Sequence, residues 1–143
     1  MIALLILLLV NIVLFCNFKE DPVLLEVREK YKTFREHLKT NGDEKFQMLH
    51  REIPIVAYRG STISGVGYNS NKGGEIGICI DGTSNNVFHV LLHELAHCTV
   101  TDYSHGTEFW DNYTELKAEA IRIGIYENIN QLTPFCGKKI VDK

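Results

Sequence analysis

The chain has 143 residues, of which 45% are hydrophobic, and its formal net charge is −3. With a pI of about 6.1 and no basic stripe interleaved with aromatic residues, it gives no direct signal for nucleic-acid binding. The roughly 120 residues that follow an apolar N-terminus suit one domain with one hydrophobic core. No internal repeat or low-complexity linker divides this part of the sequence.

The first 18 residues, MIALLILLLVNIVLFCNF, contain no charged side chain, and only Asn11 and Asn17 interrupt the apolar run. A helix of this length is about 27 Å long, close to the hydrocarbon thickness of a bilayer, about 30 Å. We therefore predict a transmembrane signal anchor at residues 1–18, in contact with membrane lipid, and a separate domain at 19–143. A cleaved signal peptide and a buried globular helix are the alternatives. The sequence lacks the basic N-region and small-residue cleavage site that a signal peptide carries.

The charges that flank this segment predict the orientation of the protein. Five basic residues follow the segment: Lys19, Arg28, Lys30, Lys32 and Arg35. Because basic flanks stay on the cytoplasmic side, we expect a single-pass membrane protein whose C-terminal domain faces the cytosol. The domain holds three cysteines, Cys79, Cys98 and Cys136. This odd number is unlike a disulfide framework and agrees with a cytosolic domain.

The domain begins with an amphipathic helix. Asp21 and Pro22 form the usual helix-opening pair, and Asn41-Gly42 marks the end. Apolar residues recur between them at alternating spacings of three and four: Leu24, Val27, Tyr31, Phe34 and Leu38. This heptad-like stripe is explained either by packing onto the domain core, which we favour, or by a partner surface.

Short β-type runs with interspersed glycines follow. We predict strands at 55–59, 63–68 and 76–80, with a turn at 69–74, which together form a small antiparallel sheet. Gly60, Gly65 and Gly67 do not form a phosphate-binding loop, since the terminal Lys-Ser/Thr pair is missing. They are better explained as bulges or points of close backbone approach.

The motif His93-Glu94-Leu95-Ala96-His97 carries the chemistry. Residues four apart share one face of a helix, so both imidazoles can bind one tetrahedral metal ion. Glu94 points away from that face and is placed to take a proton from a water at the open coordination position. The surrounding apolar run, with cap candidates at 84–86, predicts a largely buried helix. The alternative is a core helix whose polar groups bond only among themselves.

A third metal ligand must come from outside this helix, and His105 is the nearest candidate in the sequence. Three imidazoles plus an open position are typical of a catalytic zinc site. His89 lies one turn before His93, but three histidines at successive spacings of four drift around the helix and do not readily close one tetrahedral site. Cys98 points about 100° away from His97 and is better explained as a small buried residue.

A further helix is predicted after His105, with Thr107 as its cap. Its apolar face is formed by Phe109, Tyr113, Leu116, Ala120 and Ile123. Phe109 and Trp110 are assigned to the core rather than to substrate contacts, because this spacing is the ordinary buried stripe. Residues 131–143 give no indication of their role.

The segment His105-Gly106-Thr107-Glu108-Phe109-Trp110, together with the upstream motif, resembles the zinc peptidases of the WLM and SprT-like group. The likeness extends through 114–117 and 120–126 to Phe135-Cys136-Gly137. Over this stretch the sequence resembles the short WLM proteins of large DNA viruses. The spacer from His97 to His105 is longer than in typical WLM motifs and shorter than in SprT-like ones. The resemblance covers about the C-terminal half of the chain or more.

The resemblance implies an α+β, zincin-like fold in which His93, His97 and His105 bind Zn²⁺ and Glu94 is the general base. It implies a metallopeptidase that hydrolyses peptide bonds in protein substrates, and with the predicted anchor this gives a membrane-anchored enzyme. Beside zinc itself, Tyr103 and Tyr58 are candidate donors to the oxyanion. The alternative is a virion or membrane structural protein that keeps the fold, with zinc structural or absent. Capsid or membrane proteins would then be its partners, and a virion membrane its location. A secreted peptidase with its signal removed is a third hypothesis.

Overall fold

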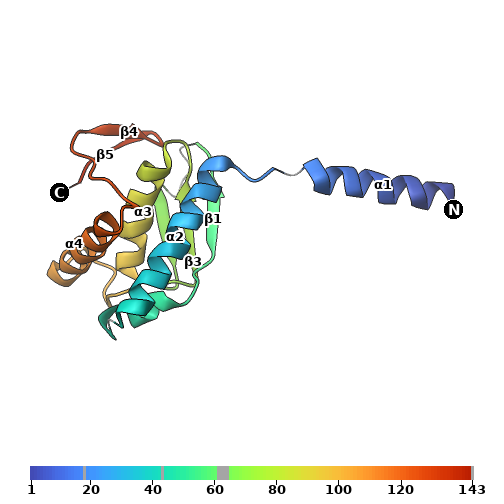
Figure 1. Cartoon of the computed structure of the whole chain (residues 1–143). Helices are drawn as coiled ribbons and strands as arrows, with labels where there is room; N and C mark the ends of the chain where they lie inside the picture. The colour runs from blue at the N-terminus through green and yellow to red at the C-terminus, as the bar shows by residue number, and fades with distance from the viewer. Residues whose placement is uncertain (18, 43, 61–64, 143) are drawn as a thin grey trace.

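The computed structural model describes residues 1–17, 19–42, 44–60 and 65–142, which form a small α+β fold (Figure 1). Its helices are α1 (Ile2–Asn17), α2 (Pro22–Asn41), the 3-10 segment η1 (Glu44–His50), α3 (Ser84–His97) and α4 (Thr107–Arg122). Its strands are β1 (Ile55–Tyr58), β2 (Gly67–Ser70), β3 (Glu75–Cys79), β4 (Thr133–Phe135) and β5 (Lys138–Ile140).

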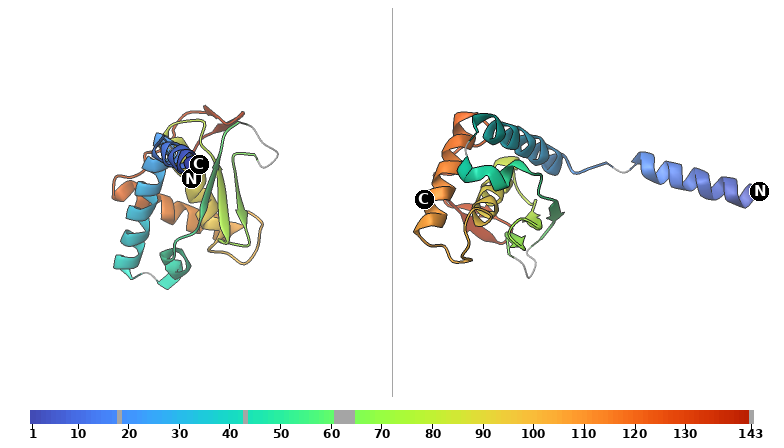
Figure 2. Two further views of the ribbon diagram at one scale, coloured as in Figure 1. Left: turned by 90° about the vertical axis from the view of Figure 1, so that its right-hand side faces the viewer. Right: turned by 90° about the horizontal axis from the view of Figure 1, so that it is seen from below.

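Helix α1 projects away from the domain, and all of residues 1–16 are exposed (Figures 1 and 2). No helix in the described part of the chain is long and apolar enough to cross a membrane. With 16 residues, α1 is about 24 Å long, shorter than a hydrocarbon core of about 30 Å. The predicted transmembrane anchor was therefore wrong, as was the single-pass location with a cytosolic domain or in a virion membrane. The alternative of a buried globular helix is also wrong.

Helix α2 has the start, end and buried face that the sequence predicts. Asp21 Oδ1 accepts hydrogen bonds from the backbone N–H groups of Val23 at 2.9 Å and Leu24 at 3.4 Å. Gly42 closes the helix in the left-handed conformation, with φ of 65°. The five residues of the predicted apolar stripe are all buried, and α2 packs against α3 and η1. Packing onto the core therefore accounts for this stripe.

The sheet has the order β1-β3-β2, with β1 parallel and β2 antiparallel to β3. The prediction of a wholly antiparallel sheet was wrong. Strand β3 takes the central position and is the most buried of the three: residues 76–79 are all buried, whereas β1 and β2 contain no fully buried residue. The predicted strand at 63–68 lies at 67–70 instead, and its first residues, 63 and 64, fall outside the described part of the chain. The turn narrows to 71–74, since residues 69 and 70 pair with β3.

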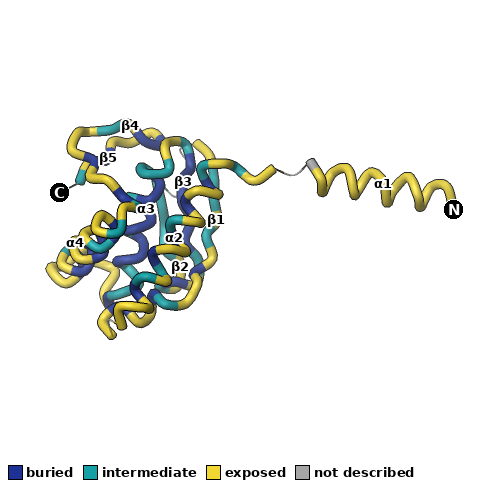
Figure 3. Tube along the Cα trace, in the orientation of Figure 1, coloured by how far each residue is buried: buried dark blue, intermediate teal, exposed yellow. Residues whose placement is uncertain are grey.

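Helix α3 is the central element of the domain, with α4 on one side and the sheet on the other (Figure 1). Figure 3 shows that burial is concentrated in α3 and strand β3, whereas residues 2–16 of α1 are exposed. Phe34 of α2 packs edge-on against Phe88 of α3, with ring centroids 6.2 Å apart. This packing fixes α3 on several sides, so side chains on its remaining face are held in place.

The C-terminal segment folds back as the hairpin β4–β5 and is tied to the sheet by a disulfide bond between Cys79 and Cys136. The Cα atoms of the two cysteines are 6.4 Å apart, and 57 positions separate them in the sequence. The prediction from the odd cysteine count was wrong, because Cys98 stays free while the other two cysteines of the domain pair. The bond also removes the cysteine argument for a cytosolic domain.

Candidate metal centre

Helix α3 carries the His-Glu-Leu-Ala-His motif in its last turn and a half. The helix is capped by Thr83, whose Oγ1 accepts a hydrogen bond from Asn86 N at 3.2 Å. The cap thus lies one residue before the predicted candidates at 84–86. Most apolar residues of α3 are buried against α2, α4 and the sheet. His93 and His97 lie one turn apart on the same face of this buried helix.

The structure brings His93, His97 and His105 together. One ligand nitrogen from each lies within 4.8 Å of the other two, and the Nε2 atoms of His93 and His105 are 3.0 Å apart. His105 comes from the loop before α4, so helix α3 and this loop together form the cluster. The imidazole centroids of His97 and His105 are 4.8 Å apart, and those of His93 and His97 are 5.0 Å apart.

The three imidazoles fit a metal ion in number, spacing and protonation. Nitrogens that bind one tetrahedral ion at about 2.0–2.1 Å lie about 3.4 Å from each other, which is within the spread of this cluster. Burial, followed by the nearby His105 and Lys72, lowers the pKa of His97. The neutral imidazole, which is the form that binds metals, is thereby favoured. His97 Nδ1 is buried and finds no hydrogen-bond partner in the described part of the chain. His105 is exposed, which leaves one side of the cluster open.

Glu94 lies beside this cluster but is not part of it. Its side chain is 6% exposed, and burial raises the pKa of its carboxyl group to about 7. A group with this pKa can both accept and return a proton near neutral pH. Asn69 Nδ2 donates a hydrogen bond to the backbone carbonyl of Glu94 at 2.7 Å, which ties β2 to the motif.

Gly67 allows β2 to approach the motif closely. A Cβ atom at position 67 would lie 2.5 Å from Val90 Cγ1 and 3.0 Å from Glu94 Oε1. Both distances are shorter than van der Waals contact, so only glycine fits here without a shift of strand or helix. The prediction that this glycine marks a close backbone approach is confirmed.

Phe109 of α4 forms the floor of the cluster. It is 1% exposed, and its ring centroid lies 4.5–5.0 Å from those of all three histidines. Helix α4 begins after Gly106 without a side-chain cap, so the predicted cap at Thr107 was wrong. The assignment of Phe109 to the core is confirmed, and its position also restricts how the imidazoles can turn.

A cavity of about 330 Å³ opens over the cluster and is lined by residues of β2, the following turn, α3 and the loop that carries His105. Tyr103 lines it, whereas Tyr58 is not among its lining residues and its hydroxyl group donates a hydrogen bond to Gly65 O at 3.0 Å. Lys72 also lines the cavity, with its ammonium group 4.4 Å from the centroid of the Tyr103 ring. Of these two tyrosines, only Tyr103 therefore lines the cavity over the histidine cluster.

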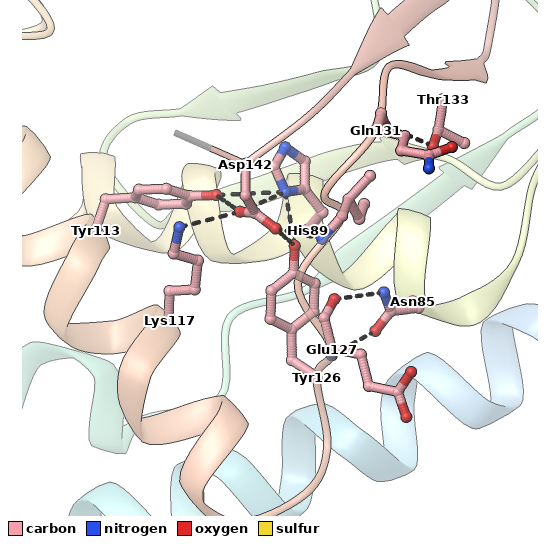
Figure 4. Close-up of polar contacts among 10 residues, drawn as sticks. Asn85, His89, Tyr113, Lys117, Tyr126, Glu127, Gln131, Thr133 and Asp142 are labelled. Carbon is pink, nitrogen blue, oxygen red and sulfur yellow. Dashed lines mark hydrogen bonds and ion pairs between the residues drawn. The ribbon is translucent and has the colours of Figure 1, made fainter.

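His89 lies outside the metal cluster, as predicted, and belongs to a buried network centred on Asp142 (Figure 4). Its Nδ1 atom lies 2.9 Å from the Tyr126 hydroxyl oxygen and 3.4 Å from Asp142 Oδ1. Tyr126 and Tyr113 both donate hydrogen bonds to the Asp142 carboxylate, at 2.5 and 3.2 Å. The network fastens the C-terminal segment to α3, one turn before His93.

Burial alone raises the pKa of Asp142, but its hydrogen bonds outweigh this effect and hold the pKa below 3.8. The hydrogen bonds come from the Tyr126 hydroxyl, the backbone N–H of Ile129 and the Lys117 ammonium group. The sequence analysis missed Asp142 and the role of the tail. An acidic residue in a tail has no periodic pattern to mark it, and only the folded chain brings it to His89.

No family model, curated protein or solved structure matches this chain.

Proposed function

We propose that this protein is a zinc-dependent metallopeptidase that hydrolyses peptide bonds in protein substrates. The observation that carries the proposal is the convergence of three imidazoles, open on one side, beside the buried carboxylate of Glu94, which comes from the helix that carries two of them. Three histidine ligands with a free position are typical of catalytic rather than structural zinc. The buried Glu94 argues against a purely structural protein that keeps the fold, since a scaffold gains nothing from a desolvated carboxylate.

In this mechanism His93, His97 and His105 would hold the ion, and Phe109 keeps their rings in place. Zinc bound there would supply Lewis acidity to the attacking water and the scissile carbonyl group. Glu94 takes a proton from the attacking water as its oxygen bonds to the carbonyl carbon. The same carboxyl group then gives that proton to the amine nitrogen as the C–N bond breaks. The Tyr103 hydroxyl is the donor that the cavity offers to the carbonyl oxygen.

The substrate in this proposal is an extended polypeptide. Strand β2 pairs only with β3 in the described part of the chain, and its residues 67–69 line the cavity of the metal centre. A polypeptide that adds to the free edge of β2 would hydrogen-bond along its backbone and lie across Glu94. Such backbone recognition explains why a shallow cavity can suffice for a large substrate.

The test is metal content and cleavage of an unfolded protein by the full chain, with Glu94→Gln and His105→Ala variants. We expect one zinc ion per chain, with cleavage reduced by at least about 100-fold in Glu94→Gln at unchanged zinc content. His105→Ala should lose zinc affinity. Glu36 is an exposed acidic residue on α2, so Glu36→Gln is the matched control. It should bind zinc and cleave the substrate as the wild type does. A folded chain that binds no zinc, or an active Glu94→Gln variant, would refute the proposal.

A further inference from the structure

A second cavity, of about 220 Å³, adjoins the metal centre one turn closer to the start of α3. It shares Gly67, His93 and Glu94 with the cavity over the histidine cluster but is otherwise lined by different residues. The two cavities therefore meet at the carboxylate to which the proposed mechanism gives the proton transfer. Anything bound in the second cavity would lie directly beside the scissile bond.

The C-terminal hairpin forms one wall of this second cavity, through Lys138 and Ile140 of β5. The hairpin is held by the Cys79–Cys136 disulfide bond, and the chain just beyond it is held by the buried Asp142. This wall is therefore a fixed part of the domain. The backbone from which Lys138 projects therefore has a defined position relative to Glu94.

Lys138 is the charged group that this wall contributes. A methyl group on Gly65 would lie 3.4 Å from Lys138 Nζ, so the ammonium group sits close above the backbone of the chain that leads into β2. Among residues 1–17, 19–42, 44–60 and 65–142, no hydrogen bond or ion pair of this ammonium group is observed. The only carboxylate among the cavity-lining residues in that part of the chain is Glu94. An unpaired cation beside a cavity favours an anionic side chain.

The direction of β2 decides which substrate residue would lie at the second cavity. The start of β2 lies against Val90 and Glu94, whereas Asn69, further along, contacts the Glu94 carbonyl group and Cys98. A polypeptide that pairs antiparallel to β2, the more stable arrangement, would run from the Asn69 end towards Gly65. The residue that follows the scissile bond would then face the second cavity.

We propose that the second cavity binds the acidic side chain of the substrate residue that follows the scissile bond, with Lys138 determining this specificity. The inference rests on the proposed peptidase function and narrows its substrates to sites with Asp or Glu at that position. The cavity volume is several times the roughly 30 Å³ that one water molecule takes up in the liquid, so it has room for such a side chain.

The first test measures binding without catalysis. The metal-free full chain, which retains Glu94, is titrated with fluorescent peptides of about ten residues that carry Glu or Gln at one fixed position. We expect the Glu peptides to bind at least about tenfold tighter than the Gln peptides, and this difference to vanish in Lys138→Met. Lys139 is the next residue on β5, and its side chain points to the opposite face of the strand. The control variant Lys139→Glu should therefore leave the difference in affinity between Glu and Gln peptides unchanged.

The second test measures cleavage sites in an unfolded protein mixture with the zinc-loaded chain. We expect Asp and Glu to be enriched directly after the cleaved bond, and Lys138→Glu to shift this enrichment to Lys and Arg. Cleavage without an acidic preference at that position, or a preference that Lys138→Glu leaves unchanged, would overturn the inference and leave the peptidase proposal intact. If the zinc-loaded chain cleaves nothing, the peptidase proposal fails. If the metal-free chain binds Glu and Gln peptides equally well, the proposed selectivity of the second cavity is overturned.

Discussion

Replacement of Gly67 by alanine tests whether the close contact between β2 and α3 positions the general base. The new Cβ atom would lie 2.5 Å from Val90 Cγ1, whereas carbon atoms in contact lie about 3.5–4.0 Å apart. Strand and helix must therefore separate by about 1 Å. Overpacking of this kind costs about 1–3 kcal/mol, which for a domain of this size lowers Tm by roughly 4–12 °C. A displacement of about 1 Å at Glu94 would also reduce cleavage by roughly 100-fold.

The assay combines thermal unfolding of the metal-free chain with cleavage of an unfolded protein by the zinc-loaded chain. Gly106→Ala is the matched control, because its backbone φ is −70° and its nearest neighbour, Ser104 Oγ, lies 3.8 Å away. Because glycine is preferred over alanine at this N-cap position, we expect the control to lose up to about 1 kcal/mol, without displacing Glu94. If Gly67→Ala unfolds at the same temperature as wild type and cleaves at the same rate, the contact does not position Glu94, and this account of the site is refuted.

Two further predictions concern the C-terminal segment. Replacement of both Cys79 and Cys136 by serine should lower the free energy of unfolding by about 4 kcal/mol from the loop of 57 positions, measured by denaturant titration. Thiol titration of the unfolded, unreduced wild type should find two free thiols, and four would contradict the bond. The metal-free chain should also lose stability in acid. Burial lowers the pKa of His89 below 6.5, so stability falls with pH below about 6.5 as the unfolded chain takes up this proton. The pKa of Asp142 is also lowered, so its contribution is complete above 3.8 and is lost as pH falls through its folded value. Asp142→Asn should lower the free energy of unfolding by about 1–3 kcal/mol at pH 7 and should lack the loss of stability that Asp142 causes in acid. If urea titrations show the same fall in stability with pH below 3.8 in Asp142→Asn as in the wild type, this network does not stabilise the domain.

Much of the fold follows local rules, and those parts were predictable from the sequence. Helix α2 begins directly after Asp21 and ends directly before Gly42, because these cap residues satisfy helix termini whatever the tertiary context. Strands β1 and β3 lie within about one residue of their predicted positions, since their apolar runs are short and bounded by turn residues. The pairing of His93 with His97 depends only on helical periodicity.

The errors lie where a local pattern leaves more than one global solution. Apolar composition alone does not distinguish a membrane span from a shorter exposed helix, because the observed length of α1 decides the outcome. Strand positions do not specify which strand is central, so the parallel pairing of β1 with β3 was not predictable. The cysteine count did not identify the bonded pair, which requires two distant segments to meet.

By itself, the sequence determined the helix that carries His93 and His97, the apolar face that buries this helix in the core, and the identity of the nearby acidic residue, Glu94. Periodicity, capping and burial of apolar groups act over a few residues, so they can be recognised in a linear chain. Only the tertiary structure decided that His105 reaches the other two histidines, that Gly67 brings β2 against Glu94, and that the C-terminal hairpin places Lys138 beside them. These contacts join segments far apart in the chain, and their geometry is set by the packing of the whole core.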